Sequence, residues 1–204
     1  MAKIPSAAPQ RAAPKRINRS VVLQAGLAVF SAKGFNGASM RDIANEAETS
    51  LSNLYNYFPS KTFLLAQLLL DTGTDLYNRL EAAVSEAEAA PAARLAAAVT
   101  SYIGFIVDRP QASIVGISEI RYLEGPSRAE VTVVRDRTEQ LFRSILAEGS
   151  AAGEFSSHFP VDAARAIVTM CSAVSNWYRP DGPLGQAELA ERYVEFSLGI
   201  AGAH

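Results

Sequence analysis

Helical spacing is the feature of this sequence that most limits its fold. Apolar residues recur three and four positions apart along nearly the whole chain, as in the stripe Val22, Ala25, Gly26, Val29 and Phe30. That period places them on one face of an α-helix. No segment of useful length alternates apolar with polar residues, as a half-buried strand does, and no Asn-Gly turn joins two β-branched runs. The pattern therefore predicts an all-α protein of about nine helices.

Proline and glycine mark where the expected helices begin and end. Gly34 is placed to end the first helix, and Pro91 and Pro110 suit the first turn of later helices. The segment RPDGPLG, at 179–185, contains two prolines and two glycines and cannot remain helical. The expected helices cover residues 18–33, 40–47, 51–58, 61–88, 91–108, 110–123, 127–152, 161–178 and 187–202.

The two shortest expected helices, 40–47 and 51–58, carry the clearest local signals. Ser39, followed three residues later by Asp42, resembles a capping box, with Asp in place of Glu. Ser50 is an N-cap for the second short helix. A longer helix followed by two short ones with a tight turn between them forms the helix-turn-helix arrangement.

The second short helix has an apolar side and a polar side. At about 100° per residue, Leu54 and Phe58 point inward. Amides and hydroxyls on the other side can hydrogen-bond base edges and phosphate oxygens, which favours contact with DNA. The alternative is an ordinary solvent-exposed helix of a bundle. The residues that we expect to face DNA are Ser52, Asn53, Asn56 and Tyr57, with Lys61 at the start of the following helix.

The formal net charge of −2 conceals an uneven distribution. Residues 1–62 contain eight Lys and Arg against three acidic residues, a balance of +5, whereas residues 63–204 contain eleven Arg against eighteen acidic residues, a balance of −7. A basic N-terminal third is typical of an end that binds a polyanion; chance clustering of solvated charges is the alternative. We expect a disordered basic arm at 1–17, a helix-turn-helix domain at 18–62 and a helical body at 63–204.

Signals of membrane insertion, disulfide bonding and catalysis are missing. No apolar run approaches the roughly 18 residues that span a bilayer, and the first 16 residues lack the apolar core of a secretory signal. A single cysteine, Cys171, allows no disulfide framework, as in a reducing cytoplasm. Neither histidine lies in a metal-binding or catalytic motif. We expect a cytoplasmic protein with no cofactor or metal, not an enzyme; the alternative, a small all-α enzyme, needs a catalytic base in a cleft.

The segment from Val22 to Lys61 reads VLQAGLAVFSAKGFNGASMRDIANEAETSLSNLYNYFPSK. It resembles the DNA-binding region of the TetR family of bacterial one-component repressors, above all in Ser-x-Arg-Asp-Ile-Ala and Leu-Tyr-x-Tyr-Phe-x-Ser-Lys. The resemblance implies a ligand-responsive repressor that binds operator DNA as a homodimer. By position it implies that Arg41 approaches the duplex and Ser39 a phosphate, that Ser52, Asn53 and Tyr55 meet bases, and that Tyr57 and Lys61 hold the DNA backbone.

Two positions depart from the family pattern. Glu48 occupies the turn where the family usually has glycine, so either a positive φ there costs about 1 kcal/mol or the turn differs. Leu51 stands where Lys, Gln or Arg is usual, so it either contacts a thymine methyl group or packs inside the protein.

The last two expected helices carry apolar stripes with helical spacing. Two such helices from each of two chains would make a four-helix interface; the alternative is that the stripes close the core of the monomer. The family resemblance implies dimerisation through these helices. The predicted interface residues are Ile167, Met170, Val174, Leu189, Tyr193, Phe196 and Ile200.

The middle helices, 91–152, would surround a pocket for a small, largely hydrophobic effector, so we expect residues 63–204 to bind ligand and to dimerise. Arg121 would meet an anionic group, unless it is simply exposed. The C-terminal stretch WYRPDGPLGQAELAERYVEFSLGIAG also resembles an actinobacterial branch of the family that includes sensors of coenzyme A thioesters, which implies an acyl-CoA as one effector class. A helical ligand-binding or scaffold protein without DNA binding is the remaining alternative. The predicted pocket residues are Tyr102, Phe105, Ile106, Ile117, Arg121, Tyr122, Phe142 and Trp177.

Overall fold

The computed structural model describes residues 17–203, so the expected arm at 1–17 lies outside the described residues except for Ile17. The described residues form nine α-helices and two short 3₁₀ helices, and the only extended pairing among them is one bridge between Phe155 and Ala203. The prediction of an all-α protein is confirmed. None of the described helices combines the length and the apolarity needed to cross a membrane.

The observed helices begin and end within a few residues of the expected positions. The main difference is that the expected helices 110–123 and 161–178 each finish in a separate 3₁₀ turn, a tighter winding that is frequent at helix ends. The elements are α1 (Arg19–Gly37), α2 (Met40–Glu46), α3 (Leu51–Tyr57), α4 (Lys61–Glu86), α5 (Pro91–Asp108), α6 (Pro110–Ser118), η1 (Ile120–Tyr122), α7 (Gly125–Ala152), α8 (Pro160–Ala173), η2 (Val174–Asn176) and α9 (Gln186–Ala201).

The predicted helix signals in the N-terminal part are confirmed. Gly34 breaks the α1 helix with φ 67° and ψ 170°, a backbone conformation that glycine adopts without steric cost. Ser39 and Asp42 form the capping box: the Ser39 Oγ accepts from the Asp42 N–H at 3.1 Å, and the Asp42 Oδ2 accepts from the Ser39 N–H at 2.9 Å. Ser50 caps α3 by accepting from the Asn53 N–H at 3.1 Å.

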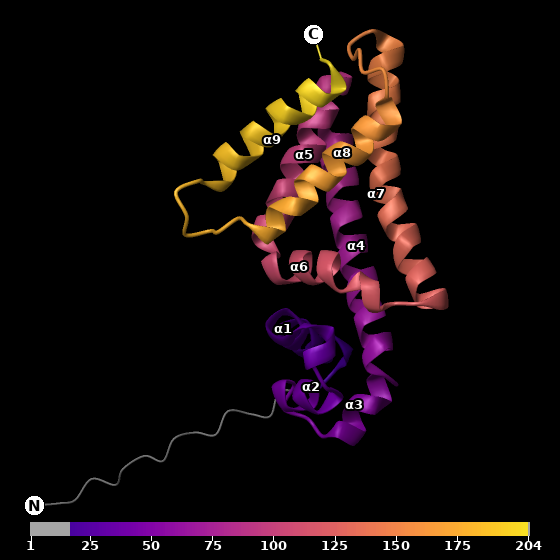
Figure 1. Ribbon diagram of the computed structural model, residues 1–204, viewed down its shortest axis with the longest axis vertical. Coiled ribbons are helices and arrows are strands. Elements are labelled where there is room, and N and C mark those ends of the chain that lie inside the picture. The colour runs from indigo at the N-terminus through magenta and orange to yellow at the C-terminus, as the bar shows by residue number, and fades with distance from the viewer. Residues whose placement is uncertain (1–16, 204) are drawn as a thin grey trace, which may run out of the picture.

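Helices α1 to α3, which we call the head, form one end of an elongated molecule, and α5 to α9, which we call the body, form the rest (Figure 1). Helix α4 runs from the head through the body. Its first half contributes Leu64 and Leu68 to one buried apolar cluster, shared with the head, and its second half contributes Leu80 and Val84 to another, shared with the body. A movement of α4 would therefore change the packing of both the head and the body.

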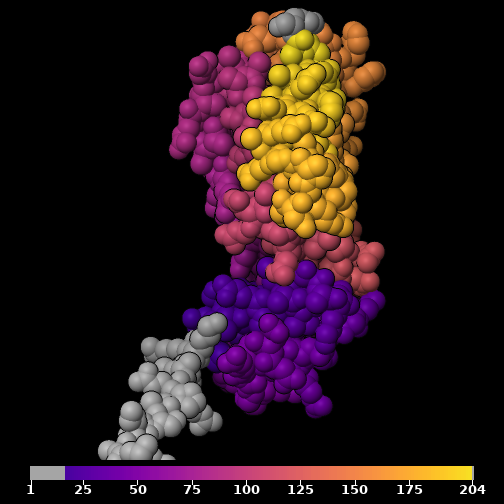
Figure 2. Space-filling view, turned by 90° about the vertical axis from the view of Figure 1, so that its left-hand side faces the viewer, coloured from indigo at the N-terminus to yellow at the C-terminus, as the bar shows by residue number. Residues whose placement is uncertain are grey.

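Helix α6 crosses the end of the body that faces the head, next to α1. Its residue Val115 belongs to the buried cluster of the head, together with Leu123 from the following loop and Val131 from α7. Helix α9 lies at the surface along one side of the body, and its C-terminal end is the part farthest from the head (Figure 2).

Candidate DNA-binding surface and ligand cavity

Helix α3 buries one side and exposes the other. Leu54 and the C-cap residue Phe58 are fully buried in the cluster shared by α1, α2 and α4, as predicted. On the opposite side, Ser52 and Asn56 are exposed, and Tyr55 has 46% of its surface exposed. These three side chains form a polar ridge at the far end of the head, and the apolar side of α3 is already occupied by its neighbours.

Two other residues predicted to contact DNA already form side-chain hydrogen bonds within the head. The Asn53 Nδ2 donates to the Thr49 Oγ1 at 2.9 Å, which ties the amide to the turn before α3. The Tyr57 hydroxyl donates to the Ile17 carbonyl at 3.1 Å, which joins the end of α3 to the chain entering α1. Both residues are half-buried. Their direct contact with DNA stays a prediction; what the structure shows is that they hold α3 in place.

Lys61, the predicted backbone contact at the start of α4, is also half-buried. Its Nζ donates to the carbonyls of Phe35 at 2.6 Å and Ala38 at 2.7 Å, and it lies 4.3 Å from the centroid of the Phe35 ring. An ammonium group has three N–H donors, so one remains for a phosphate. Lys61 thus fastens α4 to the α1–α2 loop, whether or not it also meets DNA.

The remaining two predicted contacts lie at the start of α2, Ser39 as its N-cap and Arg41 in its first turn. Arg41 is exposed. Ser39 is exposed too, but its hydroxyl takes part in the capping box with Asp42. Hydrogen bonds from Lys33 and Ser39 lower the pKa of the Asp42 carboxyl to about 2, so this cap is fully charged at neutral pH. Its negative charge stabilises the start of α2, where the backbone N–H groups concentrate positive charge.

The structure shows how the two residues that depart from the family pattern, Glu48 and Leu51, are accommodated. Glu48 has φ 52°, the only positive φ of a non-glycine residue among residues 17–203, so it adopts the conformation that glycine usually supplies. Leu51 is half-buried and packs against the apolar cluster of the head. Leu51 therefore packs inside the protein, which is one of the two expected possibilities. The turn before α3 is strained at Glu48, because a residue with a Cβ has a positive φ there.

A cavity of about 300 Å³ lies in the body between helices α4, α5, α6, α7 and α8. Four predicted pocket residues line it, and all four come from α5 and α6: Tyr102, Phe105, Ile106 and Ile117.

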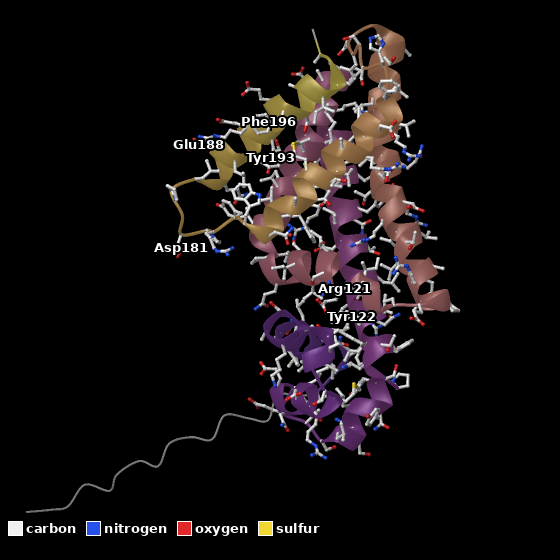
Figure 3. The ribbon with its side chains drawn as sticks, viewed as in Figure 1. Arg121, Tyr122, Asp181, Glu188, Tyr193 and Phe196 are labelled. Atoms are coloured by element: carbon white, nitrogen blue, oxygen red, sulfur yellow. The ribbon has the colours of Figure 1, made fainter. Side chains whose placement is uncertain are left out.

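The other four predicted pocket residues lie elsewhere. Arg121 is exposed on η1, and Tyr122, next to it, stacks on the Phe35 ring of the head with centroids 5.1 Å apart (Figure 3). Phe142 is fully buried in the body core, and Trp177 is 47% exposed at the end of η2. Aromatic character alone could not separate pocket from core or surface, because each of these environments accepts an aromatic ring.

The polar residues of the cavity were not predicted from the sequence. Ser113 and Thr138 line it and are both buried, and Arg135 reaches it from α7. A signal for Thr138 existed: it continues the inward stripe of Val131 and Val134 along α7, where a polar side chain is unusual. The Ser113 hydroxyl is buried and has no hydrogen-bond partner among residues 17–203.

Two ionisable groups that line the cavity, Arg135 and Tyr102, and one in the neighbouring core, Cys171, differ in their surroundings. The Arg135 Nη2 donates to the Gly116 carbonyl of α6; the residue as a whole is solvent-accessible, but loss of hydration lowers the pKa of its guanidinium, which still stays charged at neutral pH. Burial raises the pKa of the Tyr102 phenol, which therefore remains neutral. Burial also raises the pKa of the Cys171 thiol to about 12, so it is not a nucleophile at neutral pH.

The predicted dimer stripes split between core and surface. Three of the predicted interface residues are fully buried in the core of the single chain, which is the alternative considered for these stripes: Ile167, Val174 and Leu189. Phe196 is 51% exposed on α9, with its ring centroid 5.9 Å from that of Tyr193 (Figure 3). The partly buried members of the stripes are Met170, Tyr193 and Ile200.

Among the described residues, no three His, Cys, Asp or Glu side chains are grouped closely enough to hold a metal ion. A helix-turn-helix with an exposed polar ridge, joined to a helical body that contains a largely apolar cavity, defines a class of protein: a DNA-binding regulator.

Comparison with known proteins supports this class. Residues 22–68 match the family model described as bacterial regulatory proteins, tetR family, and residues 88–201 match the model described as tetracyclin repressor-like, C-terminal domain. Together these matches cover most of the head, the start of α4, and helices α5 to α9. The chain belongs to the TetR family of transcriptional regulators, and the resemblance found in its sequence is confirmed.

Individual relatives extend over nearly the full length of the chain. The transcriptional repressor KstR2 of Mycolicibacterium smegmatis is 25% identical over 194 residues, which cover 94% of both chains. A TetR-family regulatory protein of known structure from Rhodococcus RHA1 is 28% identical, with a TM-score of 0.86 over 91% of this chain and 97% of that one. AibR, solved with isovaleryl coenzyme A and operator DNA, is 20% identical, with a TM-score of 0.81 over 91% and 99% of the two chains.

Proposed function

We propose that this protein is a transcriptional repressor that binds operator DNA as a homodimer and is controlled by a small, largely hydrophobic effector held in the body cavity. The observation that carries the proposal is that one short segment, the end of α6, both lines the cavity and is hydrogen-bonded to the head. Gly116 and Ile117 line the cavity, and Glu119, two residues later, accepts from the Phe35 N–H at 2.7 Å.

Operator recognition is assigned to the polar ridge of α3. Ser52, Tyr55 and Asn56 are exposed together on the side of the helix that makes no apolar contact with the head. An amide such as that of Asn56 pairs with adenine in a major groove, and hydroxyls pair with several bases. Arg41, exposed on α2, supplies the charge for a phosphate.

Dimerisation is assigned to the outer surface of α8 and α9. Single helix-turn-helix heads read half-sites about 34–36 Å apart, so two heads must be held together by their bodies. Phe196 and Trp177 expose large apolar surfaces at α9 and at the end of η2, which is costly in water and favours burial by a second chain. KstR2, named a repressor, supports the direction of control.

Effector control is assigned to the contacts between α6 and α1. Glu119 is 5% exposed and bonded to the Phe35 backbone, and Tyr122 stacks on the Phe35 ring. A ligand that binds more tightly when α6 is displaced favours the state in which the head has moved with α6. The size of this population shift is set by the difference between the ligand's affinities for the two states. An acyl-CoA thioester is one candidate effector, supported by the isovaleryl coenzyme A bound to AibR.

The decisive test is a fluorescence anisotropy titration of the full chain against duplexes from the region upstream of its own gene, at several salt concentrations. We expect specific binding that weakens steeply as salt rises, because phosphate contacts release counterions, and release of the duplex when an effector is added. A chain that binds hydrophobic ligands but no duplex at low salt would instead be the helical ligand-binding or scaffold protein.

A further inference from the structure

We propose that the end of the cavity between α6 and α7 is a carboxylate-binding subsite formed by Ser113 and Arg135, so that the effector is an apolar molecule with a single carboxylate. The proposal rests on the proposed function only in taking this cavity as the effector site. It goes further by naming the chemical group that the site selects.

The first observation is the Ser113 hydroxyl. Ser113 lines the cavity and is 8% exposed, yet its Oγ has no hydrogen-bond partner among the described residues. A buried hydroxyl without a partner is unfavourable, and such groups are rare in native proteins. The missing partner is therefore an atom that enters the cavity, and a ligand oxygen can accept this hydrogen bond.

The second observation is the position of the Arg135 guanidinium. Its Nη2 donates to the Gly116 carbonyl, and Arg135 takes part in none of the ion pairs among residues 17–203. Ser113 and Gly116 are three residues apart in α6 and share one face of that helix. Both residues line the cavity, and the carbonyl that accepts from Arg135 lies about one helical turn along α6 from Ser113. A guanidinium has five N–H donors in a planar fork that matches a carboxylate.

The remaining charges around the cavity limit the ligand to one negative charge. Glu139 is paired with Arg143 and also with Arg165 at 3.4 Å, so its charge is balanced. Asp136 lies on the exposed rim and forms no ion pair within the described chain, so it repels a second anion. The apolar part of the lining accepts a hydrocarbon body and consists mainly of Leu69, Leu76, Phe105, Ile106, Val131 and Val134.

The test is isothermal titration of the purified full chain with hexanoate, octanoate and decanoate, each compared with its methyl ester. We expect the acids to bind at least tenfold more tightly than the esters, since a hydrogen bond to a charged group contributes roughly 1.5–3 kcal/mol, or about a 10- to 150-fold change in affinity. Arg135→Gln and Ser113→Ala should each remove most of this preference and leave ester binding unchanged, and Arg135→Lys should keep part of it. Arg121→Gln, at an exposed arginine outside the cavity, is the matched control and should change neither.

The outcomes separate this subsite from the proposed function. Equal binding of acid and ester, or acid binding that survives Arg135→Gln in a variant with unchanged thermal unfolding, overturns the subsite. Failure of all three acids to bind, together with operator release by octanoyl coenzyme A, overturns the subsite and leaves ligand-controlled repression intact. Acids that bind through Arg135 without changing operator affinity support the subsite and contradict effector control.

Discussion

Glu119 and Phe35 are 84 residues apart in sequence, yet the Glu119 Oε2 accepts a hydrogen bond from the Phe35 N–H at 2.7 Å. The other carboxylate oxygen accepts from the Ser118 hydroxyl at 2.7 Å, so both oxygens of this buried group are satisfied. The bond reaches the chain immediately after Gly34, where the positive φ ends the regular α1 helix. It therefore connects the end of the cavity-lining helix α6 to the break in α1.

We expect Glu119→Ala to loosen this connection. The Phe35 N–H, which is partly buried, loses its partner, and an unsatisfied buried donor costs up to about 1–3 kcal/mol of the free energy of unfolding. Amide hydrogen exchange at Phe35 should accelerate strongly in Glu119→Ala and far less in Glu119→Gln, which keeps an acceptor oxygen. Glu124→Ala, at an exposed glutamate nearby, is the control. Unchanged protection of Phe35 in Glu119→Ala would show that the contact does not hold the head.

Replacing Glu48 by glycine should stabilise the protein. The left-handed conformation costs a residue with a Cβ about 1–2 kcal/mol, and glycine avoids this cost. Part of the gain is offset, because glycine loses more conformational entropy on folding. We expect Glu48→Gly to raise the free energy of unfolding by up to about 1 kcal/mol, measured by urea denaturation. Glu48→Ala removes the same charge but keeps the Cβ, so it should give no such gain. A gain of equal size in both variants would assign the effect to charge.

Gly149→Ala should destabilise the body. A Cβ on Gly149 would lie 2.1 Å from the nearest ring carbon of Phe155, which is itself buried. Overpacking of this kind typically costs about 1–3 kcal/mol. Gly104→Ala, in the interior of α5 where the nearest atom would be 3.5 Å from the new Cβ, should instead be neutral or stabilising. The thermal unfolding temperature should therefore fall in Gly149→Ala and stay the same or rise in Gly104→Ala, and equal decreases in both variants would contradict this packing.

Asn56→Ala should reduce specific operator binding. Loss of a base-reading amide costs about 1–3 kcal/mol for the operator and little for a scrambled duplex of the same length. Arg41→Ala, which removes a phosphate contact, should weaken binding to both duplexes and lower the salt slope by about one. Asn78→Ala, at an exposed amide of α4 within the body, serves as the control. If Asn56→Ala lowers the affinity for operator and scrambled DNA equally, Asn56 does not read a base.

Phe196→Glu should convert a dimer into monomers. The side chain is 51% exposed in the single chain, so the change leaves the monomer core intact. A charge buried without a partner in an interface is strongly unfavourable. We expect a lower molar mass by light scattering at concentrations where the unmodified chain is dimeric, and weaker operator binding. Val133→Glu, at a residue that is 55% exposed on α7, should leave the mass unchanged. A persistent dimer in Phe196→Glu places the interface elsewhere.

The local features of the fold could be predicted because they depend on neighbouring residues. The capping box of Ser39 and Asp42, the N-cap of Ser50 and the break at Gly34 each involve groups within a few positions of one another. The same holds for the buried side of α3 at Leu54, since the helical period alone decides which residues share a face.

By itself, then, the sequence determined the order of the helices, the helix-turn-helix and the buried side of α3, because hydrophobic period and capping act over a single turn. Only the tertiary structure decided which groups are already bonded to distant parts of the chain. It gave two donors of Lys61 to the carbonyls of Phe35 and Ala38, and it left the Ser113 hydroxyl without a partner inside a cavity. Such pairings depend on how whole helices pack, and no local pattern records that packing.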